Sequence, residues 1–145
     1  MKKIYSVFRA LFFKRSSNNL LEDVDQLLAH WVTAVNRCDV DAVMQLFAAD
    51  VMFYGTSTKT LITNSKDIRQ YFEQAFTQLQ PLVMTVSDKK ISFANNDVML
   101  LACSDKWSVT LDDQQQVMFG RLVMTAAIKQ GAWKIVSFHR SVMPE

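Results

Sequence analysis

Apolar residues in the first half of the chain recur every three or four positions, which is the spacing of one buried face of a helix. Residues able to cap a helix stand before these stretches, and a proline, which cannot continue a helix, follows the last of them. The pattern predicts an apolar helix stripe over 20–35 capped by Asn19, a short helix over 39–47, a strand over 51–55, and a helix over 65–79 capped by Asn64.

After Pro81 the apolar positions alternate, as expected for strands with one buried face. Four such runs lie near 82–94, 97–110, 116–129 and 132–142, and the connections between them are short enough for hairpin turns. Helices followed by a meander of antiparallel strands indicate an α+β fold. We expect a cone-shaped, curved antiparallel sheet wrapped around the N-terminal helices, with a cavity inside.

The composition is that of one globular domain, since half of the 145 residues are hydrophobic and the net charge is only +2. Residues 1–15 hold five of the sixteen basic residues and no acidic one, so the remainder has eleven basic and fourteen acidic residues. A net acidic domain is not expected to bind nucleic acid. We therefore divide the chain into a basic amphipathic segment over 1–18 and a folded domain over 19–145.

The basic segment has three interpretations. It packs on its own domain or a partner subunit, it makes weak contact with a membrane surface through residues 1–18, or it is a secretory signal. Arg9 interrupts the apolar stretch and no small-residue cleavage site follows, which disfavours the signal. Packing is the interpretation we favour, and the membrane contact is kept as a hypothesis.

The chain carries no motif for a metal or a cofactor. Cys38 and Cys103 lack the spacing of metal ligands or redox pairs, and His30 and His139 are far apart. The cysteines are therefore expected to be free thiols in the reducing cytoplasm. We predict neither a metal site nor a bound cofactor.

The last strand ends in the cluster His139-Arg140-Ser141, which is unusual for a strand otherwise suited to a core. If a hairpin turn pairs Lys129 with Ala132, then Arg121 lies directly opposite Arg140 on one face of the sheet. Two like charges in that arrangement repel, so we expect an anion between them. A carboxylate suits this place because it matches the fork of a guanidinium group.

Asp105 is the carboxylate that the chain itself offers, because it is the lone charge on an apolar strand face. A five-residue turn after that strand places Asp105 opposite Arg121, whereas a four-residue turn places Lys106 there. We prefer the first register because it keeps the apolar residues of both strands on one face. Two outcomes stay open: a structural pair with the second arginine solvated, or a net positive pocket that binds a small organic anion.

Aromatic residues are the candidate walls of this pocket. The candidates are Trp31 and His30 on the first helix and Phe53 and Tyr54 on the first strand, although each also suits a plain core position. His139 is expected on the face opposite Arg140, either as a hydrogen-bonded structural residue or as a general base.

Several stretches resemble the nuclear transport factor 2-like superfamily, which includes the SnoaL-like polyketide cyclases. The stretch HWVTAVNRCDVDAVMQLFAADVMFYG is similar to its opening, NSKDIRQYFEQAF to its third helix, and FGRLVMTAAIKQGAWKIVSFHRSVMP to its final hairpin. That hairpin is especially similar to the association (hub) domain of calcium/calmodulin-dependent protein kinase II. The resemblance implies a conical fold that dimerises through its sheet, with a pocket between the sheet and the first helix.

The resemblance also bears on chemistry. Similar hub domains bind small carboxylates with pocket arginines, and Arg140 matches one such position, while another falls at Met124. In ketosteroid isomerase-like members, the proton-transferring residues stand at positions that correspond to Trp31, Gly55 and Thr125, none of which can do that work.

Our leading interpretation is a dimeric small-molecule-binding protein with an apolar pocket for an organic anion. Two alternatives remain because this fold hosts many functions. One is a SnoaL-like enzyme, such as a cyclase, isomerase or hydratase, that uses Asp105 or His139. The other is an oligomerisation module.

Overall fold

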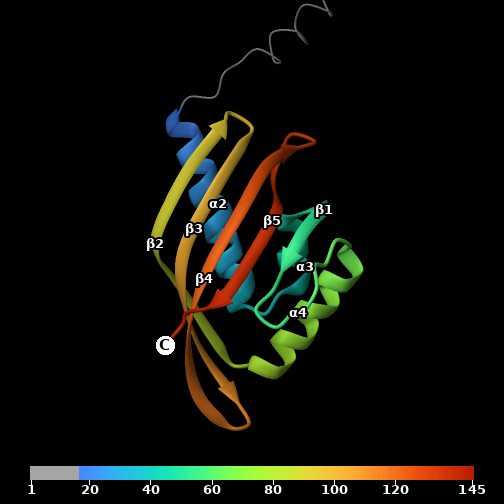
Figure 1. Cartoon of the computed structure of the whole chain (residues 1–145), viewed down its shortest axis with the longest axis vertical. Coiled ribbons are helices and arrows are strands. Elements are labelled where there is room, and N and C mark those ends of the chain that lie inside the picture. Colours follow the sequence, from blue (N-terminus) through green and yellow to red (C-terminus); the bar gives the residue numbers. More distant parts are fainter. Residues whose placement is uncertain (1–16) are drawn as a thin grey trace, which may run out of the picture.

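The computed structural model describes residues 17–145 as three helices and a five-stranded sheet (Figure 1). In chain order the elements are α2 (Ser17–Asn36), α3 (Val40–Leu46), β1 (Phe47–Tyr54), α4 (Ser65–Leu79), β2 (Leu82–Asn95), β3 (Val98–Leu111), β4 (Gln114–Lys129) and β5 (Ala132–Val142). Residues 1–16, which form most of the basic segment, lie outside the described residues. Within residues 17–145, no helix is both long and apolar enough to cross a membrane.

The helix boundaries follow the predicted signals closely. The Asp39 side chain accepts a hydrogen bond from the Ala42 backbone N–H at 3.0 Å, and Asn64 accepts one from Asp67 at 2.9 Å. Each bond satisfies a donor that the first turn of a helix leaves unpaired. The cap predicted at Asn19 is wrong, because α2 already begins at Ser17.

The strands form one sheet in the order β1-β5-β4-β3-β2. The α+β class and the antiparallel meander of β2 to β5 are confirmed. The sheet as a whole is mixed and mostly antiparallel, because β1 joins the meander in the parallel direction beside β5. In Figure 1, α2 runs along one face of the sheet, and α3 and α4 lie on the side of β1.

Both turns that flank β4 contain two residues. Asp112–Asp113 connect β3 to β4 and Gln130–Gly131 connect β4 to β5, and all four have positive φ angles, as type I′ hairpin turns require. The second turn is as predicted. The first is shorter than either turn considered for it, so Asp105 pairs with Gly120 rather than with Arg121.

A β-bulge in β5 changes the register between β4 and β5. Val136 has no partner on β4, although the residues on both sides of it do. The extra residue shifts the rest of β5 by one position, which is what a bulge does. Arg121 therefore pairs with Ser141, and the predicted pairing of Arg121 with Arg140 is wrong.

An aromatic cluster joins the helices to the inner face of the sheet. The rings of Phe53 and Phe138 are stacked with centroids 4.9 Å apart, and Trp31 lies 5.2 Å from Phe138 at a steep angle. Phe47 and Phe72 complete the cluster. All five side chains are buried. Because they come from α2, α4, β1 and β5, their packing fixes the elements that surround the space beneath the sheet.

Polar contacts fix both ends of α2. Near its end, Asn36 donates to the Met84 carbonyl at 3.0 Å and accepts from the Met84 N–H at 2.6 Å. Near its start, Asp23 accepts a hydrogen bond from Trp133 Nε1 at 2.9 Å. The helix is thus attached to the edge strand β2 and to β5.

We predict that Phe138→Ala lowers the free energy of unfolding by about 3–5 kcal/mol, because it removes the ring at the centre of the cluster and leaves a cavity. Phe119→Ala is the matched control, since Phe119 is 51% exposed while Phe138 is 3% exposed. Chemical denaturation measures both. Equal losses for the two variants would contradict the assigned core.

Candidate functional site

A cavity of about 240 Å³ lies between α4, the inner face of the sheet and the loop that follows β1. Its walls are mainly aromatic and aliphatic. The lining residues are Trp31 of α2; Thr56 and Ser57 of the loop; Tyr71, Phe72, Gln74, Ala75, Gln78 and Leu79 of α4; Trp107 and Met118 of the β3–β4 hairpin; and Phe138 and Arg140 of β5.

Arg140 is the one charged residue among those that line the cavity. Its Nε donates to Asp105 Oδ2 at 2.7 Å, and its Nη2 donates to Asp105 Oδ1 at 2.6 Å. Its Nη1 donates to Thr56 Oγ1 at 2.7 Å. Arg140 is 6% exposed and Asp105 is 4% exposed, so the ion pair is buried. The two parallel N–H···O bonds are of the strong, charge-assisted kind. Because both charges are buried, loss of either partner would leave the other uncompensated.

Gly120 provides the space in which this ion pair forms. Asp105 lies on β3 and Arg140 on β5, so the guanidinium group must pass over the strand between them. A Cβ atom at Gly120 would lie 2.3 Å from Arg140 Nη2 and 2.5 Å from Asp105 Oδ1. The glycine is therefore required by the close approach of two side chains.

Trp107 forms the wall beside the guanidinium group. The Arg140 Cζ lies 4.8 Å from the centre of the Trp107 ring, within the range of a cation–π contact. The inner face of the sheet therefore holds Arg140 by a carboxylate, a hydroxyl and an aromatic ring.

The residues predicted for the site fall into two groups. Trp31 and Arg140 line the cavity, and Asp105 lies behind Arg140 as its ion-pair partner. Arg121 lies on the other face of the sheet, where it is exposed and its Nε donates to Ser141 Oγ at 3.3 Å. The predicted cluster of two arginines and one acid therefore does not form, because the bulge and the short turn separate Arg121 from the pair.

Tyr54 and His139 also lie outside the cavity. Both are exposed on the outer face, with ring centroids 5.6 Å apart. The orientation of His139 opposite to Arg140 is confirmed, whereas the prediction of Tyr54 as a pocket wall is wrong. Side chains alternate between the two faces along β1, so Tyr54 points outward because its neighbour Phe53 points inward.

The sequence pattern missed the contributions of Thr56 and Met118. Thr56 belongs to a loop without periodicity, so no signal marked its hydroxyl as a partner of Arg140. Met118 required the register of β4, in which it pairs with Trp107. Tyr71 was recognisable as an inward-facing helix residue, but its place beside the cavity was not.

The Tyr71 hydroxyl is the one lining group besides the Arg140 guanidinium that is suited to exchange a proton. The other lining residues include no carboxylate, histidine, lysine or cysteine. Burial raises the pKa of the Cys103 thiol to about 11, with the negative charge of Asp105 adding to this rise. Cys103 therefore stays protonated at neutral pH and is a poor nucleophile.

Gly55 stands where the resemblance would place a general base, and Tyr71 fills the space beside it. A Cβ atom at Gly55 would lie 2.4 Å from Tyr71 Cζ and 2.6 Å from its hydroxyl oxygen. The tyrosine ring therefore lies against the Gly55 backbone and occupies the space of any side chain there.

The comparisons agree with this fold. A family model of the SnoaL-like domain matches residues 24–145, so the chain belongs to the SnoaL-like family. No curated protein matches the sequence.

Three solved structures illustrate the similarity. A protein from Xanthomonas campestris, provisionally named a calcium/calmodulin-dependent protein kinase II association domain, is 21% identical with a TM-score of 0.76, over 84% of this chain and 86% of that one. A nuclear transport factor 2-like protein of unknown function from Pseudomonas putida KT2440 is 18% identical with a TM-score of 0.78, over 90% of each chain. A provisionally named dehydratase of the same fold family from Streptomyces avermitilis is 14% identical with a TM-score of 0.78, over 90% of this chain and 100% of that one. At these identities the likeness shows the fold alone.

We predict that Asp105→Ala lowers the free energy of unfolding by about 3–5 kcal/mol, because it leaves the buried Arg140 guanidinium without its counter-charge. The matched control is the double variant Asp105→Leu with Arg140→Met, which removes both charges and keeps much of the volume. It should be clearly more stable than the single variant in urea denaturation. A single variant as stable as the wild type would show that the pair is not buried as described.

Proposed function

We propose that this protein binds a small, largely apolar organic molecule that carries a hydrogen-bond-accepting oxygen. The observation that carries the proposal is the cavity itself. Its lining combines aromatic walls with one buried, oriented cation and contains no carboxylate, histidine, lysine or cysteine. Pockets of this kind usually bind a ligand through apolar contact and orient it by a few polar groups.

Arg140 supplies the polar end of the pocket. A guanidinium group has five N–H donors, and three of those of Arg140 have partners among the described residues. The remaining two are available to an oxygen acceptor of a ligand. A carboxylate and a neutral carbonyl share this chemistry.

The sequence alone suggested a pocket with a net positive charge, whereas the structure has one arginine balanced by one carboxylate. Two arginines against one acid would favour an anion strongly, but Arg121 is on the outer face and Asp105 balances Arg140. A net neutral ion pair attracts an anion less than an unpaired arginine would. The acceptor oxygen, rather than a full negative charge, is therefore the feature that we expect the pocket to recognise.

The cavity volume limits the ligand to a small molecule. An apolar cavity of about 150 Å³ is enough to hold benzene, so about 240 Å³ suits a ring with a short substituent. The aromatic side chains of Trp31, Phe72 and Phe138 around it favour a flat body.

Asp105 and His139, the two residues considered for an enzyme, are poorly placed for catalysis at the cavity. Their positions therefore favour a binding function. Asp105 accepts two hydrogen bonds from Arg140, and this arrangement fixes its carboxylate in place behind the arginine. His139 lies on the face of the sheet that does not border the cavity.

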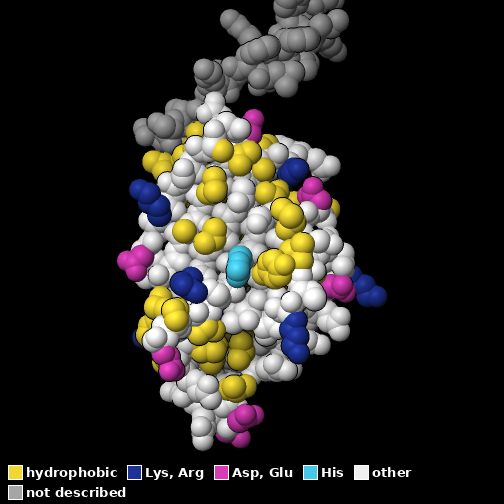
Figure 2. All heavy atoms as spheres, viewed as in Figure 1, with side chains coloured by type: hydrophobic (Ala, Val, Ile, Leu, Met, Phe, Trp, Pro, Cys, Tyr) yellow, Lys and Arg dark blue, Asp and Glu magenta, His cyan; other side chains and the backbone are white. Residues whose placement is uncertain are grey.

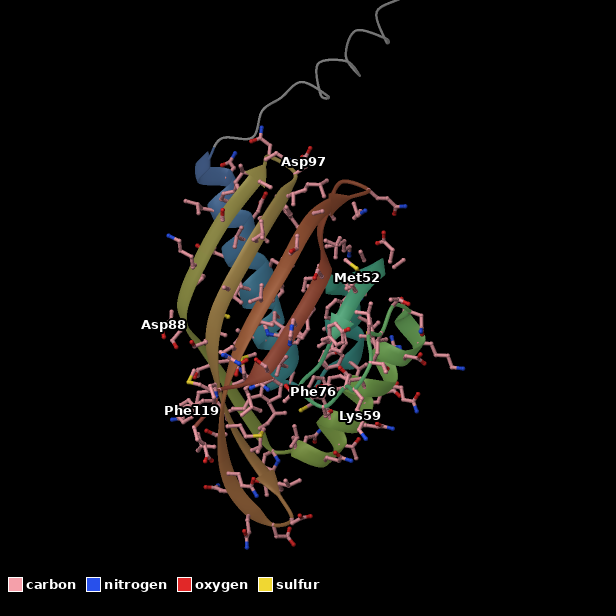
Figure 3. All side chains as sticks on the ribbon, in the orientation of Figure 1. Met52, Lys59, Phe76, Asp88, Asp97 and Phe119 are labelled. Carbon is pink, nitrogen blue, oxygen red and sulfur yellow. The ribbon has the colours of Figure 1, made fainter. Side chains whose placement is uncertain are left out.

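We also propose that the protein forms a homodimer through the outer face of the sheet. Seven large apolar side chains on this face are at least 40% exposed: Met52, Tyr54, Val83, Leu100, Val117, Phe119 and Val123. Figure 2 shows apolar side chains spread over this face around a histidine, and Figure 3 shows Met52 and Phe119 towards its opposite sides. Exposed apolar area of this extent typically marks an interaction surface.

The ligand proposal predicts that benzoate or acetophenone raises the melting temperature. A ligand at 100 times its dissociation constant stabilises the folded state by roughly 2.7 kcal/mol, which corresponds to a shift on the order of 5 °C. Ala75→Leu should abolish the shift, because Ala75 lines the cavity and the larger side chain fills it. Differential scanning fluorimetry measures both proteins.

The control for this experiment is Ala29→Leu, which makes the same change at an exposed position of α2. It should keep the full shift. Equal shifts in wild type and Ala75→Leu would place binding elsewhere and contradict the proposal.

The dimer proposal predicts that Val123→Glu yields a monomer, because it places a charge at a 50% exposed position on the central strand β4. Sedimentation velocity or light scattering measures the mass. Leu21→Glu is the control, since Leu21 is 46% exposed but lies on α2. A monomeric wild type, or a dimeric Val123→Glu variant, would exclude this interface.

A further inference from the structure

Among the buried side-chain donors in the described part of the chain, one has no hydrogen-bond partner. It is Nε1 of Trp107, a residue that is 6% exposed and lines the cavity. Buried donors are nearly always paired, because an unpaired one has lost its water without replacement. Trp133 shows the usual arrangement, since its Nε1 donates to Asp23 at 2.9 Å. The unpaired indole N–H of Trp107 is therefore unusual and needs a physical explanation.

The neighbours of Trp107 offer it no oxygen. Its register partners on the two adjacent strands are Met84 on β2 and Met118 on β4. The guanidinium group of Arg140, which is itself a donor, lies over the indole ring. The residues beside the Trp107 ring on both strands and over its face thus contribute weak sulfur acceptors and a donor rather than an oxygen, in line with the unpaired Nε1.

We propose that the Trp107 indole N–H is a specificity-determining donor for the ligand and binds its acceptor oxygen together with Arg140. This inference rests on the proposed binding function and deepens it. Because the Arg140 Cζ lies 4.8 Å from the ring centre, one carbonyl or carboxylate group can reach donors of both residues. The preferred ligand is then a small aromatic carbonyl compound or aromatic acid.

A small rearrangement must accompany binding, because Trp107 Nε1 has essentially no accessible surface in the empty pocket. Met118 is the neighbour suited to move. It is partly buried and lines the cavity, whereas Met84 is 1% exposed. An unbranched methionine side chain can change rotamer at low cost. A ligand oxygen would take the place that Met118 vacates.

The test compares three probes of similar shape: benzoate, acetophenone and toluene, the last of which has no acceptor. For Trp107→Phe we expect the affinity for benzoate and acetophenone to fall about 5- to 10-fold, the usual effect of one lost hydrogen bond, with toluene affinity unchanged. Trp31→Phe is the matched control, because Trp31 also lines the cavity and its loss should affect all three probes alike.

Nuclear magnetic resonance of the wild type gives a second readout that does not depend on a variant. The indole ¹⁵N–¹H signal of Trp107 should move to lower field with benzoate and acetophenone but not with toluene. The Trp133 signal should stay in place, because its donor is already bonded to Asp23.

The outcomes separate the two proposals. Unchanged benzoate affinity in Trp107→Phe, or an unmoved Trp107 signal in a wild type that binds benzoate, would overturn the inference and leave the binding function standing. Absence of binding by any of the three probes to the wild type would overturn both. If Trp107→Phe does not fold, the wild-type signal decides.

Discussion

The buried ion pair between Asp105 and Arg140 is the interaction on which the pocket depends. It connects β3 and β5 across the strand between them, and it does so over Gly120, the one residue type that leaves room for it. Removing one partner would leave an uncompensated charge inside the domain, so neither residue can change alone without a large cost. Because Thr56 binds the same guanidinium group, the loop after β1 is fixed to the sheet at the same point.

The same ion pair sets the chemistry of the cavity. It presents an arginine whose charge is balanced but whose donors are only partly used, beside aromatic walls and an unpaired indole N–H. Such a site has an excess of donors and no carboxylate, histidine, lysine or cysteine among its lining residues. The SnoaL-like fold supports many functions, so the distinction between a binder and an enzyme rests on these particular side chains.

The His-Arg-Ser cluster at the end of β5 shows how the two faces of one sheet divide their roles. Arg140 points inward to the pocket, while His139 and Ser141 lie on the outer face with Tyr54 and Arg121. This alternation puts Arg140, the polar centre of the cavity, one residue away from the surface proposed for dimerisation. A contact on the outer face therefore need not obstruct the cavity.

Apolar periodicity, caps and turn residues are local signals, so the helices, the four-strand meander, the α+β class and the family could be predicted from the sequence. The sequence also pointed to Trp31 and Arg140, which line the cavity, and to Asp105 behind Arg140. The pairing of the strands, in contrast, depends on contacts between distant segments and could be read from the folded domain alone. The parallel contact of β1 with β5 joins distant segments, and the bulge at Val136 shifts one strand by a single residue. Since neighbouring strand residues point to opposite faces, register decides which charged side chains can meet, and here it selected one arginine and excluded the other.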